Sequence, residues 1–193
     1  MSIDKPLAIC CDLDDCVFSF LGPFLDSYNN YNFKSVSLSD VQDYDFEPAL
    51  TRYLHYVEVN GFYLDLPVEF GAITFIKKMK ELGIFVIFIT ARPEQFKRDT
   101  VLALFKNKIV YDELFFSKNK VKTILQLKTR YDILGMIDDR FKTIKDVSLK
   151  CGLPFNFLIT KPHNESVSLR GSRVIRVNYI LDIYKQMATR SLK

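Results

Sequence analysis

Acidic and hydroxyl side chains come directly after three of the most apolar segments of this chain. In chain order they are Asp12, Asp14 and Asp15, then Thr90, then Asp138 and Asp139. Carboxylates gathered at one place repel one another, and they persist there when a cation neutralises them. Because no cluster of His or Cys accompanies these oxygen ligands, they favour a hard ion, and we expect Mg²⁺.

A lysine-rich stretch, Ser117–Lys122, lies between the threonine and the second acidic pair. A hydroxyl and an ammonium group beside a metal ion can hold an anion against it, so the set has the parts of a phosphoryl-transfer site. Each part alone is ordinary, since most such threonines are turn or cap residues and most lysines are solvated. Their common position after apolar segments, in this order, carries the hypothesis.

The apolar segments predict a parallel sheet, because continuous apolar character over a few residues suits strands buried on both faces. The segments are Leu7–Cys11, Ile84–Ile89, Leu134–Ile137, Phe155–Ile159, Val174–Val177 and a weaker one at Leu114–Phe116. Helical patterns alternate with them at Pro67–Leu82, Pro93–Lys106, Lys120–Lys128 and Phe141–Lys150. This alternation predicts a doubly wound α/β fold, in which ligands bind beyond the carboxyl ends of the strands.

One long segment interrupts the alternation. Residues 19–66 separate the first strand from the helix that leads to the second, and a structureless loop of that length is uncommon in a compact domain. Helices are expected within it, near Pro23–Tyr31 and Pro48–Val59. We therefore predict a small helical cap at 19–66, inserted into an α/β core made of residues 1–18 and 67–193.

Composition and charge narrow the class of protein. Of the 193 residues, 48% are apolar and 26% charged, as in a globular chain with a buried core. The longest apolar run, Ile84–Ile89, is too short to span a membrane, and we expect no secretion signal. Residues 1–69 carry 12 acidic and 3 basic side chains, whereas 70–193 carry 11 and 24, so the second part suits an anionic ligand. Four cysteines without a CxxC pattern predict free thiols in a cytoplasmic protein.

The motifs resemble those of a known family. The order Asp12-Leu13-Asp14, Thr90, Lys120 and Asp138-Asp139 is similar to the four motifs of the haloacid dehalogenase-like (HAD) phosphohydrolases. The pieces ICCDLDDCV, VIFITARP and GMIDDR are each typical of that family, and the resemblance covers nearly the whole chain. It implies a HAD-like Rossmannoid core, with the insertion between the first two motifs as a C1-type cap.

A narrower resemblance is to the 5′(3′)-deoxyribonucleotidase branch of this family. It is carried by KNKVKTILQLKTRYDILGMIDDR, by FLITKPHNES and by a cap that starts DCVFSFLGPFLDSYNN. Two positions depart from the usual pattern, since Asp15 stands where Gly is commonest and Cys16 stands where Thr or Val is usual. The family uses the backbone at these two positions, so the departures concern the local fit of the chain.

The resemblance implies a role for each motif residue. Asp12 is expected to attack phosphorus and form an aspartyl-phosphate, with Asp14 as general acid and base. Thr90 and the N–H of Ala91 are expected to hold phosphoryl oxygens, and Lys120 is expected to neutralise the transition state. Lys118 and Lys122 compete with Lys120 for that role. The expected Mg²⁺ ligands are Asp12, the backbone carbonyl of Asp14, Asp139 directly, and Asp138 from a second position or through water.

Substrate contacts are expected from two arginines and from the cap. Arg92 and Arg140 are candidate contacts, of which Arg140 has the better claim. A stacking face for a base could come from aromatic side chains at Phe18, Phe20, Phe46, Tyr53 and Tyr56. We expect a nucleoside monophosphate as the substrate, with a pyrimidine deoxyribonucleotide favoured, and neither a nucleic acid nor a membrane as a partner; a homodimer is left open.

Other interpretations remain. A HAD phosphatase of other specificity could act on a polynucleotide 3′-phosphate or a small sugar phosphate. Two interpretations without catalysis are a silent HAD scaffold and a receiver-like phosphoacceptor domain. In a receiver domain the acidic pair comes first and the phosphorylated Asp follows a later strand, whereas here the second acidic pair comes last.

Overall fold

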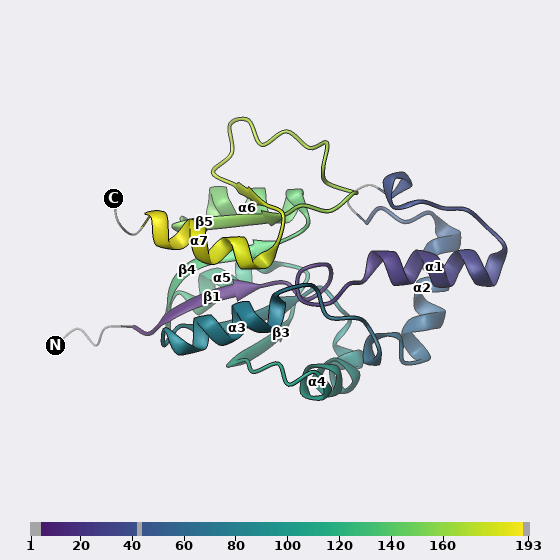
Figure 1. Cartoon of the computed structure of the whole chain (residues 1–193), viewed down its shortest axis with the longest axis horizontal. Coiled ribbons are helices and arrows are strands. Elements are labelled where there is room, and N and C mark those ends of the chain that lie inside the picture. Colours follow the sequence, from purple (N-terminus) through teal and green to yellow (C-terminus); the bar gives the residue numbers. More distant parts are fainter. Residues whose placement is uncertain (1–4, 42–43, 191–193) are drawn as a thin grey trace.

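Six parallel strands form the centre of this protein, whose computed structural model describes residues 5–41 and 44–190. In chain order the strands are β1 (Leu7–Cys11), β2 (Phe85–Thr90), β3 (Glu113–Phe116), β4 (Asp132–Asp138), β5 (Phe155–Ile159) and β6 (Ile175–Val177). They lie in the order β3-β2-β1-β4-β5-β6, and each neighbouring pair is parallel (Figure 1). The predicted doubly wound α/β fold is confirmed, with small shifts at the strand ends.

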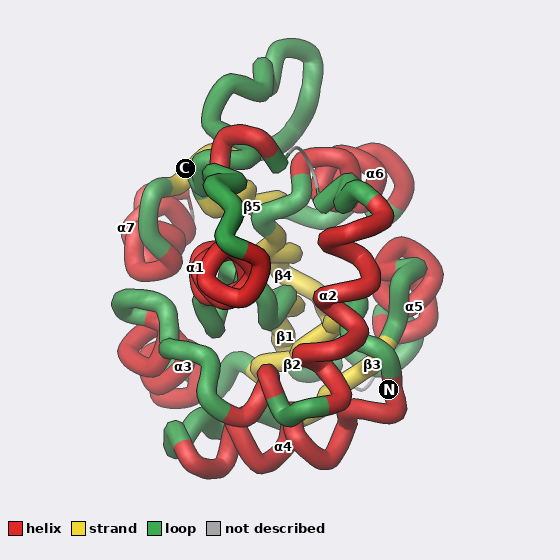
Figure 2. The backbone as a smooth tube through the Cα atoms, turned by 90° about the vertical axis from the view of Figure 1, so that its right-hand side faces the viewer, coloured by secondary structure: helices red, strands yellow, loops and turns green. Residues whose placement is uncertain are grey.

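Helices cover both faces of the sheet, because alternate side chains of each buried strand point to opposite faces and both sets are apolar. One face carries α5 (Lys120–Leu127) and α6 (Phe141–Lys150). The other carries α3 (Ala72–Glu81), α4 (Lys97–Lys106) and α7 (Ile180–Arg190). Figure 2 shows α5 and α6 on one side of the strands, with α3 and α7 on the other.

Two helices differ in their bounds from the expected ones, and a third helix was not expected. The helix expected from Pro67 begins only at Ala72, because Gly71 adopts a left-handed conformation (φ 81°) directly before it. The helix expected from Pro93 is divided into a 3₁₀ turn, Glu94–Phe96, followed by α4. Helix α7 was not expected, although its buried Ile180 and Ile183 pack on the sheet.

The inserted segment lies beyond the carboxyl ends of the strands. It contains α1 (Leu21–Asn32), the 3₁₀ turns Leu38–Asp40 and Phe62–Leu64, and α2 (Pro48–Val59). Both long helices stand at the end of the molecule toward which β1 runs (Figure 1). Among the described residues, no helix is both long and apolar enough to cross a membrane.

The chain changes direction across the sheet between β1 and β4. From β1 it builds β2 and β3 on one side, then returns to build β4, β5 and β6 on the other. Such a switch point opens a crevice beyond the carboxyl ends of the two central strands, where ligands bind in doubly wound sheets. The register pairs Cys11 with Ile137, and the N–H of Asp12 donates to the carbonyl of Ile137 at 2.9 Å. The residues that follow β1 and those at the end of β4 therefore meet at this crevice.

Candidate active site

A buried lysine lies between two carboxylates at the switch point. Asp12 follows β1, Asp138 ends β4, and Lys120 is the first residue of α5. The Nζ atom of Lys120 is 2.8 Å from Oδ1 of Asp12 and 2.8 Å from Oδ2 of Asp138. All three residues are buried: Asp12 and Lys120 are each 5% exposed, and Asp138 is 0% exposed. Three sequence segments far apart in the chain thus supply one compact group of charges.

The charges of this group support one another. Burial raises the pKa of Asp12 well above its ordinary value, although Lys120 opposes the shift. Burial likewise raises the pKa of Asp138, with Lys120 again opposing. Burial alone would lower the pKa of Lys120, but the two carboxylates raise it above its ordinary value, so this lysine is a permanent cation. Two buried carboxylates beside one ammonium leave negative charge that a further cation would neutralise.

Asp139 lies next to this group with one oxygen engaged and one oxygen free. Its Oδ2 accepts from the hydroxyl of Tyr44 at 2.8 Å and lies 2.9 Å from Nε2 of His163. Its backbone carbonyl accepts from Nδ2 of Asn164 at 2.7 Å. Its Oδ1 is buried and has no hydrogen-bond partner in the described part of the chain. An unpaired buried carboxylate oxygen is costly, so this atom points to a missing positive ligand.

The carboxylates of Asp12, Asp138 and Asp139 fit a divalent cation. One ligand oxygen from each lies within 4.8 Å of the others, and all three residues are buried. Asp138 is the least available, because its Oδ2 binds Lys120 and its Oδ1 accepts the N–H of Arg140 at 2.8 Å. The free Oδ1 of Asp139 is therefore the oxygen best placed for direct ligation. Hard carboxylate oxygens are the ligands that Mg²⁺ takes in proteins.

Arg92 makes its main contacts with another predicted site residue, Asp14. Expected as a substrate contact, it is 3% exposed and holds Asp14 through three contacts, Nε at 3.1 Å from each oxygen and Nη2 at 2.6 Å from Oδ1. The ring of Tyr63 lies 4.1 Å from the guanidinium carbon, and Thr100 accepts from Nη1 at 3.3 Å. Although Arg92 also borders the cavity, most of its donors are already engaged, so it positions Asp14.

Thr90 and Ala91, the predicted phosphoryl contacts, lie at the end of β2. Thr90 is fully buried, and its hydroxyl oxygen accepts the N–H of Arg92 at 3.2 Å. Ala91 borders the same cavity as Asp12 and Asp14. The hydroxyl of Thr90 thus shapes the turn after β2.

The contacts of Asp15 explain how an aspartate can stand where glycine is usual. Its φ of 53° lies in the left-handed region, where glycine is favoured. Its carboxylate accepts the N–H groups of Phe20, at 2.9 Å, and Leu21, at 3.1 Å, at the start of α1, and it also accepts from the hydroxyl of Tyr44. Burial raises the pKa of Asp15 to about 6, and Asp139 adds to the shift. The backbone of Asp15 is therefore strained, and its carboxylate connects the inserted segment to the core.

A cavity of about 530 Å³ lies between the core and the inserted segment. From the core it is bordered by Asp12, Asp14, Ala91, Lys118 and Arg140. From the inserted segment it is bordered by Phe20, Tyr44, Phe46, Leu54, Glu58 and Tyr63, among others. The predicted Phe20 and Phe46 thus line it.

Three other predicted aromatic residues do not line this cavity. Phe18 is fully buried, and Tyr53 packs against the rings of Phe24 and Tyr28. Tyr56 borders a separate depression on the outside of the inserted segment. Phe18 therefore belongs to the buried core, whereas Tyr53 packs within the inserted segment and Tyr56 lies on its outer surface.

Comparison with known proteins supports the fold. No family model and no curated protein matches the sequence. Among solved structures, a dehalogenase has a TM-score of 0.66 at 11% identity and covers 95% of this chain and 98% of its own. The candidate HAD hydrolase YfnB of Bacillus subtilis, bound to magnesium, has a TM-score of 0.61 at 11% identity and covers 96% and 100%. A chain of the Pnkp1/Rnl/Hen1 complex has a TM-score of 0.52 at 19% identity and covers 91% and 47%. The chain has a HAD-like fold, and identities this low establish no more than that.

Two residues of the site were not predicted from the sequence. Tyr44 comes from the inserted segment and joins Asp15 to Asp139, and burial raises the pKa of its hydroxyl well above its ordinary value. His163 lies beside Asp139, with its Nε2 2.9 Å from Oδ2 of that residue. Burial alone would lower the pKa of His163, but Asp139 raises it above its ordinary value, so the imidazole favours its charged form. The segment FLITKPHNES, which follows β5, was the signal that could have placed it at the same sheet edge.

Proposed function

We propose that this protein is a Mg²⁺-dependent phosphomonoester hydrolase that acts through an aspartyl-phosphate on Asp12, with nucleoside monophosphates as substrates. The observation that supports this proposal most strongly is the buried group of Asp12, Lys120 and Asp138 beside the free oxygen of Asp139. A carboxylate held next to a permanent cation can approach an anionic phosphate without prohibitive repulsion. A HAD-like fold is compatible with this chemistry.

Asp12 is the proposed nucleophile. One of its carboxylate oxygens forms a bond to phosphorus, and the bond between phosphorus and the leaving oxygen breaks. Lys120 neutralises the charge that develops on the phosphoryl group, and it opposes the effect of burial on Asp12. Asp12, Asp139 and the carbonyl of Asp14 would hold Mg²⁺, which when bound supplies positive charge to the carboxylates and the phosphoryl oxygens.

Asp14 is the proposed acid and base. The leaving oxygen takes a proton from Asp14, which then accepts a proton from the water that attacks the aspartyl-phosphate and frees Asp12. In the structure an ion pair with Arg92 holds the carboxylate of Asp14 beside the cavity. We propose that Arg92 releases Asp14 when substrate enters, so that Asp14 can reach the leaving oxygen.

The cavity supports a nucleotide as the substrate. Its volume of about 530 Å³ is that of an ordinary small-molecule site, and aromatic rings border the side that faces the inserted segment. Phe20 and Phe46 offer faces on which a base could stack, a contact worth about 1–3 kcal/mol. Lys118 and Arg140 supply positive charge at the core side. A sugar phosphate offers no flat partner for these rings.

The test is a phosphate-release assay on thymidine monophosphates, a hexose phosphate and an aryl phosphate, with and without EDTA. We expect hydrolysis in Mg²⁺, its loss in EDTA and its return when Mg²⁺ is added back. The matched control is Asp12→Asn, which is nearly isosteric and should lower kcat by about a thousandfold or more. Full hydrolysis after removal of metal would contradict the hydrolase proposal. A hexose phosphate with a higher kcat/KM than any nucleotide would contradict only the substrate.

A further inference from the structure

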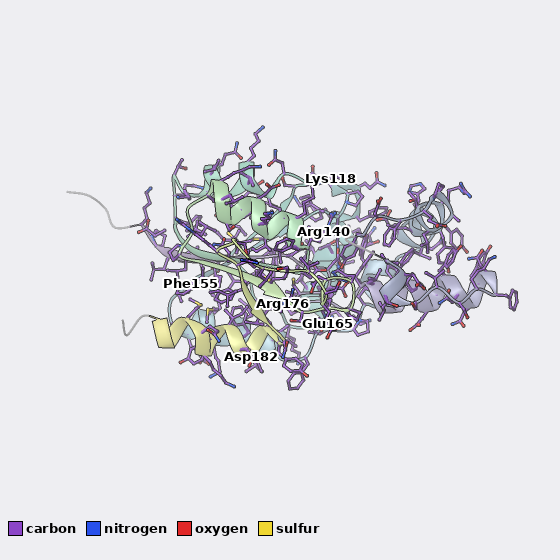
Figure 3. The ribbon with its side chains drawn as sticks, turned by 90° about the horizontal axis from the view of Figure 1, so that it is seen from above. Lys118, Arg140, Phe155, Glu165, Arg176 and Asp182 are labelled. Carbon is purple, nitrogen blue, oxygen red and sulfur yellow. The ribbon has the colours of Figure 1, made fainter. Side chains whose placement is uncertain are left out.

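A second hollow, which we call the basic groove, adjoins the active-site cavity and extends from the first turn of α5 along the length of α6. Its volume is about 560 Å³, so it is as large as the cavity itself. It is bordered by five basic residues and one acidic one: Lys118, Lys120, Arg140, Lys142 and Lys150, with Asp146. Lys118 and Arg140 border both hollows, so the two adjoin each other. Figure 3 shows these two side chains close to each other on the core, beside the inserted segment.

Three exposed lysines supply the accessible charge of the groove, because Lys120 is already held by two carboxylates. Lys142 and Lys118 are exposed, and neither has an ion pair within residues 5–41 and 44–190. Lys150 does pair with Asp146, at 2.9 Å, on the exposed surface of α6. A surface pair of this kind contributes little and leaves the lysine able to contact an anion.

The helix ends add to this positive potential. The first turns of α5 and α6 both border the groove, through Lys120 and Lys142 among others. Unpaired N–H groups in the first turn of a helix carry partial positive charge, so lysines there are unfavourable for the helix itself. Neither helix has an acidic residue in its first turn. An anion bound in the groove would neutralise both the partial positive charge of the helix ends and the charge of the lysines placed there.

The basic groove extends beyond the residues that would hold the reacting phosphate. That phosphate is held at Asp12 and Lys120, at the inner end of the groove, whereas Lys142 and Lys150 extend along α6. The inserted segment, residues 19–66, carries seven acidic and two basic side chains, so it repels a polyanion. A substrate with more than one phosphate is therefore directed along the core and away from the inserted segment.

We infer that the basic groove binds a second, unreacted phosphate of the substrate, so that the preferred substrate is a nucleotide end carrying at least two phosphate groups. This inference rests on the proposed function and refines its substrate. The shared chemistry is a phosphomonoester at Asp12 with another phosphate about one nucleotide away. A nucleoside 3′,5′-bisphosphate and the phosphorylated end of a nucleic acid strand both supply it.

The test compares four substrates: an aryl phosphate, thymidine 3′-monophosphate, thymidine 3′,5′-bisphosphate and a short 3′-phosphorylated oligothymidylate. We expect kcat/KM to be about tenfold or more higher for a substrate with a second phosphate than for the monophosphate, because each charge-assisted contact contributes that much. A preference for the bisphosphate alone identifies a small molecule, and a further rise with the oligonucleotide identifies a strand. Equal kcat/KM for the monophosphate and both larger substrates would overturn the inference.

The groove variant is Lys142→Ala/Lys150→Ala, and its control is Lys77→Ala/Lys108→Ala, two exposed lysines beside a smaller hollow near α3. In the groove variant, the ratio of kcat/KM for the preferred substrate with a second phosphate to that for the aryl phosphate should fall about tenfold, with a shallower dependence on salt. The control should keep both. An unchanged ratio in the groove variant, or an equal fall in the control, would overturn the inference.

A binding measurement separates this inference from the proposed function. Fluorescence anisotropy of a labelled 3′-phosphorylated oligothymidylate, in EDTA and without turnover, should show binding that weakens in the groove variant and not in the control. This result would support the groove even if no substrate were hydrolysed. The absence of salt-sensitive binding to the wild-type protein would contradict the groove even if the aryl phosphate were hydrolysed.

Discussion

At Asp15, contacts of the carboxylate compensate for a backbone conformation that glycine would adopt without strain. A glycine at this position would adopt φ 53° without strain, whereas an aspartate adopts it at a cost. The carboxylate offsets this cost by accepting the N–H groups that begin α1 and the hydroxyl of Tyr44. The residue therefore joins the loop after β1 to the inserted segment.

This account predicts an order of stability for two variants of Asp15. Asp15→Ala loses the carboxylate and keeps the strain, so it should lower the free energy of unfolding by about 2–3 kcal/mol. Asp15→Gly also loses the carboxylate but relieves the strain, so it should be about 1 kcal/mol more stable than Asp15→Ala. Urea unfolding of the two variants measures the difference. Equal midpoints, or a more stable alanine variant, would show that strain at this position is unimportant.

The strands and helices of the core were predictable because their signals are local. The run Leu7–Cys11 is apolar throughout, and the observed strand has the same bounds. The predicted start of α3 was wrong because the left-handed turn at Gly71 begins the helix later than the apolar periodicity of the sequence indicates. Helix α7 was not predicted, because its apolar residues alternate with many polar ones near the end of the chain.

The close contact between β4 and β5 gives a test at the level of the sheet. A Cβ atom at Gly135 would lie 2.7 Å from the backbone oxygen of Phe155, and backbone within a sheet cannot move away cheaply. Gly135→Ala should therefore lower the free energy of unfolding by about 1–3 kcal/mol, as overpacking does. The matched control is Gly22→Ala, at a position where a Cβ meets nothing within 4 Å. A Gly135→Ala protein as stable as the control in urea would contradict this packing.

At the scale of the whole molecule, the sequence predicted which residues meet but not all of their partners. Asp12, Lys120 and Asp138 could be brought together because the carboxyl ends of parallel strands share one edge. The pairing of Arg92 with Asp14 depends on a side-chain direction that no periodicity encodes. The contact of Tyr44 with Asp139 depends on how the inserted segment folds back over the core. The roles of the gathered residues remain proposals.

The central claim is that Asp12 carries the phosphoryl group during turnover. The most direct measurement is acid quench of the Asp14→Asn protein during hydrolysis of thymidine monophosphate, followed by peptide mass spectrometry. Because this variant lacks the base that activates water, the intermediate should accumulate on the peptide that contains Asp12, and Asp12→Asn should show none. A phosphoryl group on any other residue, or hydrolysis without a covalent intermediate, would contradict the account.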